Sequence, residues 1–341
     1  MFDTGLVIAE WISGAGRRPP AFRAGTSGSP SRRGVASVHD GATGRTIVVD
    51  TDDAIPALVA AGLIDTGVAL LYRGDSGTAA GVAGWRRTYL GTFTAAGSEV
   101  VVSDGFRLRQ IRYGEAEFIT FTVPTALLVT DEHDFSAFLR DADTAVAQGR
   151  FAEHLTDPLA VVANVASFGA PLDRAGPDRR IFVTADGSVS TSPFGAALGV
   201  ADDGPTELLR RWRSGPAEGG DPIGLARTVP DPDRIEAIRE RPWLPRYLEV
   251  VAVLQVIRSD RLNPGRVSGF GGRLTGGDQA AAGPDPLEST VLVQLPDAVW
   301  AVHPRSHHRF RLPDEQVRCA ETELDRVEAV PSDRPPAGAW S

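Results

Sequence analysis

Residues 290–324, near the C-terminus, constrain the fold more than any other stretch. Two apolar runs, at 291–295 and 299–302, are separated by a Pro-Asp turn, and a turn rich in His and Arg leads to a short third run before a helical pattern. Short apolar runs bounded by turn residues are typical of strands. The stretch therefore predicts a strand-strand-strand-helix unit. Such a unit has an exposed sheet edge beside a helix, where an extended peptide can bind.

The N-terminal part of the chain mixes helical and strand patterns. Residues 6–12 predict a short helix. Residues 45–50, 52–63 and 67–72 predict a strand, a helix and a second strand, which together form a β-α-β unit. Residues 87–130 contain alternating segments between Gly and Asp-Gly turns, so they predict an antiparallel meander whose strands include the segment EFITFTV.

The middle of the chain is more helical. Residues 131–149 carry apolar side chains at helical spacing and predict an amphipathic helix. Residues 151–168 are apolar and predict a helix after Pro158, and residues 180–192 predict a hairpin with an Asp-Gly turn. Further helices are predicted at residues 205–213, 231–241 and 244–258. The expected fold class is α+β (mixed α/β).

Four consecutive segments are expected along the chain. Residues 1–149 form an N-terminal α/β domain that contains the meander, and residues 150–276 form a hairpin and helical domain. A Gly-rich linker precedes the C-terminal strand and helix unit at residues 287–328. Residues 329–341 contain several prolines and are expected to form a disordered tail.

All 35 Lys and Arg residues of the 341-residue chain are arginine, because the sequence contains no lysine. A Walker A loop needs a lysine on the phosphates, and pyridoxal phosphate or Schiff-base enzymes need a lysine amine. Arginine cannot take these roles, since its guanidinium stays protonated and is not nucleophilic. These classes of enzyme are excluded, and no cofactor is predicted.

Charge and cysteine content limit the expected partners and location. The formal net charge of -9 argues against nucleic-acid binding, which relies on a basic face. The single cysteine, Cys319, can form neither an internal disulfide nor a multi-cysteine metal site, and we interpret it as a small buried residue on a helix rather than a nucleophile. No apolar run reaches transmembrane length. A cytoplasmic protein without a membrane partner is expected.

Four local patterns resemble functional sites, and each has a simpler interpretation. The acidic turn at 50–53 lacks the glycines of a nucleotide-binding loop, and the segment GDSG at 74–77 is expected to be a plain loop. Carboxylates at 131–134 suit a helix N-terminus. The histidines of residues 303–308 lack metal-ligand spacing and indicate a turn, or a patch that contacts an acidic peptide. We predict no catalytic residue and no metal site, although an acid-base enzyme using Asp, Glu or Arg stays possible.

Three segments of the chain resemble a known family. They are DEHDFSAFLRDADTAVAQGRFAEHLTDPLAVVANVASFGAP (131–171), RIFVTADGSVSTSPFGAALG (180–199) and TVLVQLPDAVWAVHPRSHHRFRLPDEQV (290–317). In these segments and in the order of its elements, the chain resembles the RiPP recognition proteins of daptide biosynthesis in actinobacteria. The resemblance implies a non-catalytic protein of natural-product biosynthesis. Such a protein binds the leader of a ribosomally synthesised precursor peptide and brings it to peptide-modifying enzymes.

The resemblance also implies a place for the leader. Leader-binding modules of this kind are winged helices of three strands followed by three helices, in which the leader adds a strand between the third strand and the last helix. Here one helix follows the strands, so either other parts of the chain supply the missing helices or the binding edge lies elsewhere. The expected peptide-binding residues are Arg309, Phe310, Arg311, Leu312, Val317 and Leu324.

Two alternative functions are also consistent with the sequence. One is an enzyme of unknown reaction in the same type of pathway, with a site between the β-α-β unit and the meander. A deep pocket lined by converging Asp, Arg and His side chains would favour it. The other is a scaffold subunit that binds only the modifying enzymes.

Overall fold

The computed structural model describes residues 3–14, 44–74, 84–170, 175–215, 225, 228–229, 231–276, 290–304 and 306–328. The chain divides into two units. Unit 1 consists of Met1–Asp141 and Ala152–Glu240, and unit 2 consists of Ala142–Phe151 and Arg241–Ser341. The chain passes between the units three times, so this division differs from the four consecutive segments expected from the sequence. Most of the expected linker and the whole expected tail lie outside the described residues.

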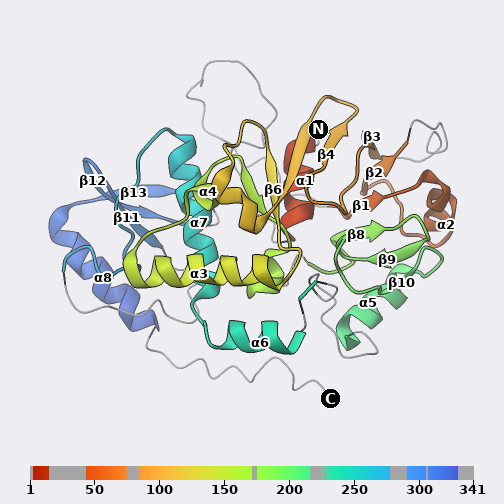
Figure 1. Cartoon of the computed structure of the whole chain (residues 1–341). Helices are drawn as coiled ribbons and strands as arrows, with labels where there is room; N and C mark the ends of the chain where they lie inside the picture. Colours follow the sequence, from red (N-terminus) through yellow and green to blue (C-terminus); the bar gives the residue numbers. More distant parts are fainter. Residues whose placement is uncertain are drawn as a thin grey trace. The chain divides into compact units, whose positions relative to one another are not determined.

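A ten-stranded mixed sheet is the framework of unit 1 (Figure 1). Its strands are β1 (Thr46–Val49), β2 (Ala69–Arg73), β3 (Trp85–Leu90), β4 (Glu99–Val102), β5 (Arg107–Arg112), β6 (Thr125–Leu128), β7 (Ala160–Val162), β8 (Arg180–Val183), β9 (Ser188–Ser190) and β10 (Gly199–Val200). Their spatial order is β10-β9-β8-β1-β2-β3-β4-β5-β6-β7. The pairings make β4 and β9 antiparallel to the other eight strands. Together with the helices, this sheet confirms the mixed α+β class.

Short helices connect and flank these strands in unit 1. They are α1 (Thr4–Ser13), η2 (Asp52–Ala54), α2 (Ile55–Ala60), η4 (Tyr113–Phe118), α4 (Glu153–Thr156), η5 (Val165–Phe168), α5 (Pro205–Ser214) and α6 (Asp231–Arg239). The predicted β-α-β unit is confirmed, because β1 and β2 are parallel and are joined by η2 and α2. The predicted hairpin is also confirmed, with Gly187 at φ 80° in the turn between β8 and β9.

The predicted meander is only partly correct. β3, β4 and β5 are antiparallel neighbours, but β2 pairs with β3 and β5 pairs with β6 in parallel. The segment EFITFTV is not a strand, because its start belongs to η4 and the rest is a loop. Parallel neighbours need a crossover connection rather than a tight hairpin, and this segment is part of that crossover.

The prediction of a helix after Pro158, within residues 151–168, is wrong. The segment forms α4, the buried strand β7 and the short η5 instead. A short apolar run does not distinguish a buried strand from a buried helix by periodicity. Here pairing with β6 decides the outcome.

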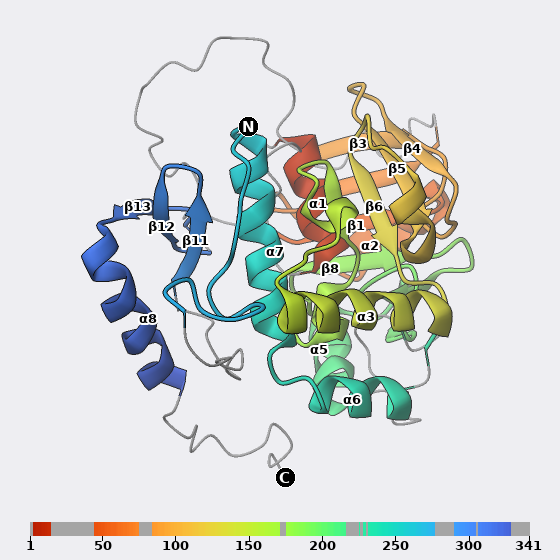
Figure 2. The same cartoon turned by 60° about the vertical axis from the view of Figure 1, so that its left-hand side comes forward.

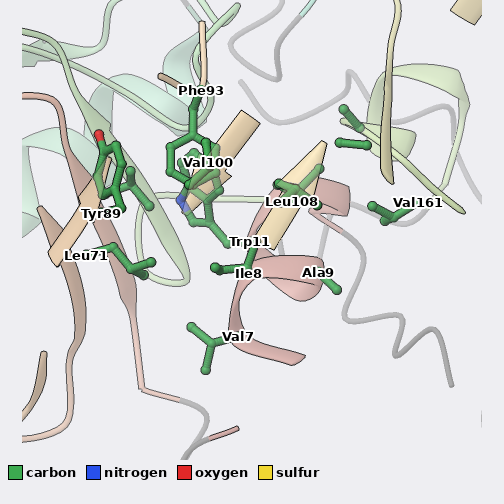
Figure 3. Close-up of a cluster of buried hydrophobic side chains, with 14 of the residues drawn as sticks. Val7, Ile8, Ala9, Trp11, Leu71, Tyr89, Phe93, Val100, Leu108 and Val161 are labelled. Carbon is green, nitrogen blue, oxygen red and sulfur yellow. The ribbon is translucent and has the colours of Figure 1, made fainter. Parts of the chain in front are cut away.

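The inner core of unit 1 surrounds α1, which is apolar on most of its circumference (Figure 3). A helix of this kind needs cover on all sides. One hydrophobic cluster joins α1 to side chains from eight adjacent strands, β1 to β8. Trp11 is 3% exposed, donates from Nε1 to the carbonyl of Ile181 at 3.2 Å and packs edge-on against Phe93. α1 is therefore part of the main hydrophobic core of unit 1.

A buried arginine fixes the C-terminal end of α1. The guanidinium of Arg180 donates to the carbonyls of Ile12 and Thr191 and to Oδ1 of Asn164. A cation near the C-terminus of a helix is favourable because it meets the negative end of the helix dipole. Gly14 ends α1 with φ 67°, and a Cβ atom there would lie 2.1 Å from the Arg180 guanidinium. Glycine is therefore required at this position both by conformation and by space.

A second core covers the other face of β8, β1 and β2. Side chains alternate along β1, so that Val48 faces α1 while Ile47 and Val49 join the second cluster. Leu58 of α2 and Leu208 of α5 complete that cluster. These central strands are consequently buried on both faces, as parallel strands usually are.

Unit 2 contains a three-stranded antiparallel sheet and its helices (Figure 2). Its elements are α7 (Leu244–Ser259), β11 (Val291–Leu295), β12 (Ala298–Val302), β13 (Arg309–Leu312) and α8 (Asp314–Glu328). The predicted amphipathic helix is α3 (Glu132–Gln148), whose last residues, from Ala142 onwards, belong to unit 2. Rings of Phe151, Tyr247 and Phe270 pack together there.

Candidate functional site

The predicted strand-strand-strand-helix stretch is confirmed as β11, β12, β13 and α8. A two-residue Pro296-Asp297 turn joins β11 to β12, which pair from Leu295 opposite Ala298 to Val291 opposite Val302. β12 then pairs antiparallel with β13, with Trp300 opposite Arg311 and Ala301 opposite Phe310. β12 is therefore the central strand, and the two outer edges belong to β11 and β13.

The outer edge of β11 is covered by residues 265–268. The N–H of Gly265 donates to the carbonyl of Gln294 at 2.8 Å, and the N–H of Gln294 donates to the carbonyl of Arg266 at 2.8 Å. The N–H of Ser268 donates to the carbonyl of Leu292 at 3.0 Å. These bonds occupy the N–H of Gln294 and the carbonyls of Gln294 and Leu292, which point outward from β11, so residues 265–268 cover this edge and block it to another strand.

The outer edge of β13 has main-chain groups without a hydrogen-bond partner among the described residues. The N–H of His303 donates to the carbonyl of His308 at 2.9 Å, which identifies these residues as a hydrogen-bonded pair. Such pairs alternate in antiparallel sheets, so Phe310 and Leu312 direct their main-chain N–H and C=O groups towards β12. Arg309 and Arg311 direct theirs away from it. No strand of the described part of the chain pairs with this side.

Side chains give the two faces of β13 different chemistry. Arg309 and Arg311 lie on the same face as Trp300, and the Arg309 guanidinium lies 5.7 Å from the Trp300 ring centroid. On the opposite face, Phe310 is 65% exposed, which is unusual for a large apolar side chain. The edge thus combines two cations on one face with an exposed aromatic ring on the other.

The two arginines keep most of their donor capacity. Arg309 Nη1 donates to Asp260 Oδ2 at 2.6 Å, and Arg311 Nη2 donates to the carbonyl of Asp297 at 3.1 Å. A guanidinium has five N–H donors. Among the described residues, each of these arginines therefore uses one donor in a hydrogen bond and can bind a further acceptor.

Helix α8 is anchored by a buried carboxylate. Glu321 is 2% exposed, and its oxygens accept from the main-chain N–H groups of Leu274 at 2.7 Å and Thr275 at 3.2 Å. The hydroxyls of Ser268 and Thr275 donate to the same carboxylate. Burial raises the pKa of Glu321, but these four hydrogen bonds outweigh it and lower the pKa below its usual value.

The expected peptide-binding residues fall into three groups. Arg309, Phe310, Arg311 and Leu312 form β13, and the first three are exposed. Val317 is 3% exposed, so it packs inside unit 2 and offers no free surface. The side chain of Leu324 lies outside the part of α8 whose side chains are described.

Cys319 lies on α8 as expected, but it is exposed, so the expectation of a buried cysteine is wrong. The helix buries Val317 and Glu321, and position 319 lies on a different face.

The predicted histidine turn is confirmed. The N–H of Ser306 donates to His303 Nδ1 at 3.1 Å, and His307 has a φ of 58°. No group of His, Cys, Asp and Glu in the described residues has a metal-binding arrangement.

Asp, Arg and Tyr side chains do meet between the β-α-β unit and β3, where the alternative enzyme site was expected. Tyr89 Oη donates to the carbonyl of Val49 at 3.1 Å and to Asp50 Oδ1 at 3.3 Å, and Arg73 lies 3.6 Å from the same oxygen. Burial and the Asp50 carboxylate raise the pKa of Tyr89. Arg73 neutralises Asp50, and Tyr89 forms a hydrogen bond with it. Such mutual pairing is typical of a polar cluster that stabilises the fold. The GDSG segment lies mostly outside the described residues.

A second polar cluster lies between η4, α3 and α4. Tyr113 Oη donates to Asp141 Oδ2 at 2.7 Å, and His154 Nε2 lies 3.7 Å from the same oxygen. The His154 ring packs edge-on against Tyr113. Burial lowers the pKa of His154, although the carboxylates of Asp141 and Glu117 oppose this effect. His154 is therefore a neutral, mostly buried imidazole at neutral pH.

Several residues that hold β11, β13 and α8 in place could not be identified from the sequence. Asp260 follows α7, and residues 265–268 carry no strand pattern, yet both shape unit 2. Glu321 is one of many carboxylates in a charged helix. Only the pairing of distant segments distinguishes these positions from ordinary surface residues.

Within the described residues, none of the helices combines the length and apolar character that a membrane span requires.

Comparison of the chain with protein-family models, curated proteins and solved structures finds no match.

Proposed function

We propose that this protein recognises a peptide by adding it as an extra strand to the outer edge of β13. The free main-chain groups of Arg309 and Arg311 are the observation that carries this proposal. An exposed edge strand presents N–H and C=O groups that can pair with an extended segment. The opposite edge of the same sheet is already satisfied by residues 265–268, so a peptide would have one side to bind.

The proposed ligand is the leader of a ribosomally synthesised precursor peptide. In this function the protein works in the cytoplasm without a catalytic step and presents the leader to the peptide-modifying enzymes of a daptide-type pathway. The resemblance in sequence supports the choice of ligand. The helices that a leader-binding module needs besides α8 would be α7 and the end of α3, which belong to the same unit as β13.

A proline at position 311 tests the strand-addition proposal. Arg311→Pro removes an outward N–H without removing a bond to β12, and edge strands tolerate such a proline. Arg311→Ala is the matched control because it keeps the N–H. We expect the proline variant to bind the fluorescein-labelled leader encoded beside this gene about tenfold more weakly than the alanine variant, as measured by fluorescence polarisation.

Thermal denaturation must first show that both variants fold like the unchanged protein. Equal leader affinities of the two variants would then exclude strand addition at β13. Absence of any binding by the unchanged protein at tens of micromolar would exclude leader recognition altogether, since specific peptide sites bind more tightly than this.

A further inference from the structure

The β13 edge is a positively charged region in an acidic protein. β13 contains two arginines and no carboxylate among its four residues, whereas the whole chain has a formal net charge of -9. Like charges placed directly opposite one another destabilise neighbouring strands, and charged residues on an edge discourage self-pairing. Two copies of β13 paired edge to edge would bring their arginines together. The charge of this edge thus opposes a second copy of the chain and favours a strand of opposite charge.

We propose that β13 selects extended peptides in which two acidic residues flank one apolar residue. This inference rests on the proposed strand addition and specifies the class of peptide. A strand paired with the outward groups of Arg309 and Arg311 places one residue opposite each arginine, on the same face of the sheet. The residue between them lies opposite Phe310, on the other face.

Each position of this pattern has a complementary group on the protein. Arg309 and Arg311 have free N–H donors, and carboxylates are the acceptors that guanidinium groups bind best. Trp300 lies on the same face as both arginines, and the Arg309 guanidinium lies 5.7 Å from its ring centroid. Phe310, at 65% exposed, gains cover from an apolar side chain opposite it. Asp260 neutralises part of the charge of Arg309, so Arg311 contributes more to acid selection.

Selection from a random peptide library tests the pattern directly. A displayed library of ten-residue peptides is enriched on the full-length protein, on the Arg309→Gln/Arg311→Gln variant and on the Arg311→Pro variant. We expect Asp or Glu at positions i and i+2 in the peptides enriched on the unchanged protein. Replacing both acids of an enriched peptide by their amides should weaken binding about tenfold, and this difference should disappear in the double Gln variant.

The outcomes separate the two proposals. Enriched peptides without paired acids, whose binding is still lost in Arg311→Pro, would overturn acid selection and leave strand addition intact. Enrichment that is equal on the unchanged protein and on Arg311→Pro would overturn both. Acid selection that persists in the double Gln variant would also contradict the proposal, because other cations would then be responsible.

Discussion

At the scale of single residues, burial determines how the polar groups of unit 1 behave. Arg180 is 2% exposed and donates hydrogen bonds to two main-chain carbonyls and one amide oxygen rather than to a carboxylate. His154 lies close to Asp141 but forms no hydrogen bond through Nε2 among the described residues. Burial opposes the charged form of both side chains and lowers both pKa values. The lowered pKa of His154 affects its protonation in a pH range in which stability can be measured.

The pKa of His154 predicts a loss of stability in mild acid. The unfolded state binds a proton near pH 6.5, whereas the folded state does so at lower pH, so the unfolded state holds more protons between these values. The free energy of unfolding should therefore fall as the pH drops below about 6.5, by at most about 1.4 kcal/mol per pH unit from this group. Urea denaturation at pH 7.5 and pH 5.5 measures the change.

Replacing the histidine provides the control for this pH dependence. His154→Gln should reduce the difference in stability between pH 7.5 and pH 5.5, because the titrating group is gone. His308→Gln removes an exposed histidine of the β12–β13 turn and serves as the matched variant. An equal reduction in both variants would show that burial of His154 is not the cause.

For helices and strands, the side chains and main-chain groups that contact an element determine its position. α1 shares one hydrophobic cluster with side chains of eight strands, and the β11 edge is covered by residues 265–268. α8 depends on the four hydrogen bonds to Glu321 and on buried Val317. The anchor joins α8 to residues 268–275 and does not use the outward groups of β13.

Removal of the Glu321 carboxylate should destabilise unit 2. Glu321→Ala leaves two main-chain N–H groups and two hydroxyls without their acceptor, and hydrogen bonds to charged groups contribute about 1.5–3 kcal/mol. We expect the free energy of unfolding to fall by about 2–3 kcal/mol in chemical denaturation. Gln316→Ala, an exposed position on the same helix, should change it by less than about 0.5 kcal/mol. Similar effects of the two substitutions would argue against a Glu321 anchor.

At the scale of the whole molecule, the chain path links the folding of the two units. Residues Ala142–Phe151 belong to unit 2, although they lie between two segments of unit 1. Within unit 2, Arg241 donates to both oxygens of Asp143 at 2.9 and 3.0 Å, and Phe151 stacks on Tyr247. A cut at one point of the chain therefore cannot separate the units cleanly.

Truncation after Glu240 tests this arrangement. The shortened chain keeps residues 142–151 but loses their partners in unit 2, including Tyr247 and Phe270. We expect a lower melting temperature than that of the full chain and increased binding of the dye ANS, because apolar side chains become exposed. An unchanged melting temperature without dye binding would mean that unit 1 folds independently of this segment.

Local sequence patterns suffice to predict the mixed class, the β-α-β unit, the β8–β9 hairpin, α3 and the order of elements from β11 to α8. These features depend on local periodicity and turn chemistry, which act over a few residues. The same patterns do not predict the structure of EFITFTV or of residues 151–168, where pairing with other strands overrides the local pattern.

Which edge of the small sheet is open depends on contacts that the sequence pattern does not reveal. Residues 265–268 close β11 without any strand signal of their own, and the β12–β13 register turns the main chain of Arg309 and Arg311 outward. The first fact follows from main-chain hydrogen bonds between segments far apart in sequence, and the second from the register of two neighbouring strands. Main-chain bonds of both kinds are largely independent of side-chain identity. A sequence pattern predicts that a strand exists, but it does not predict which neighbour satisfies its edges.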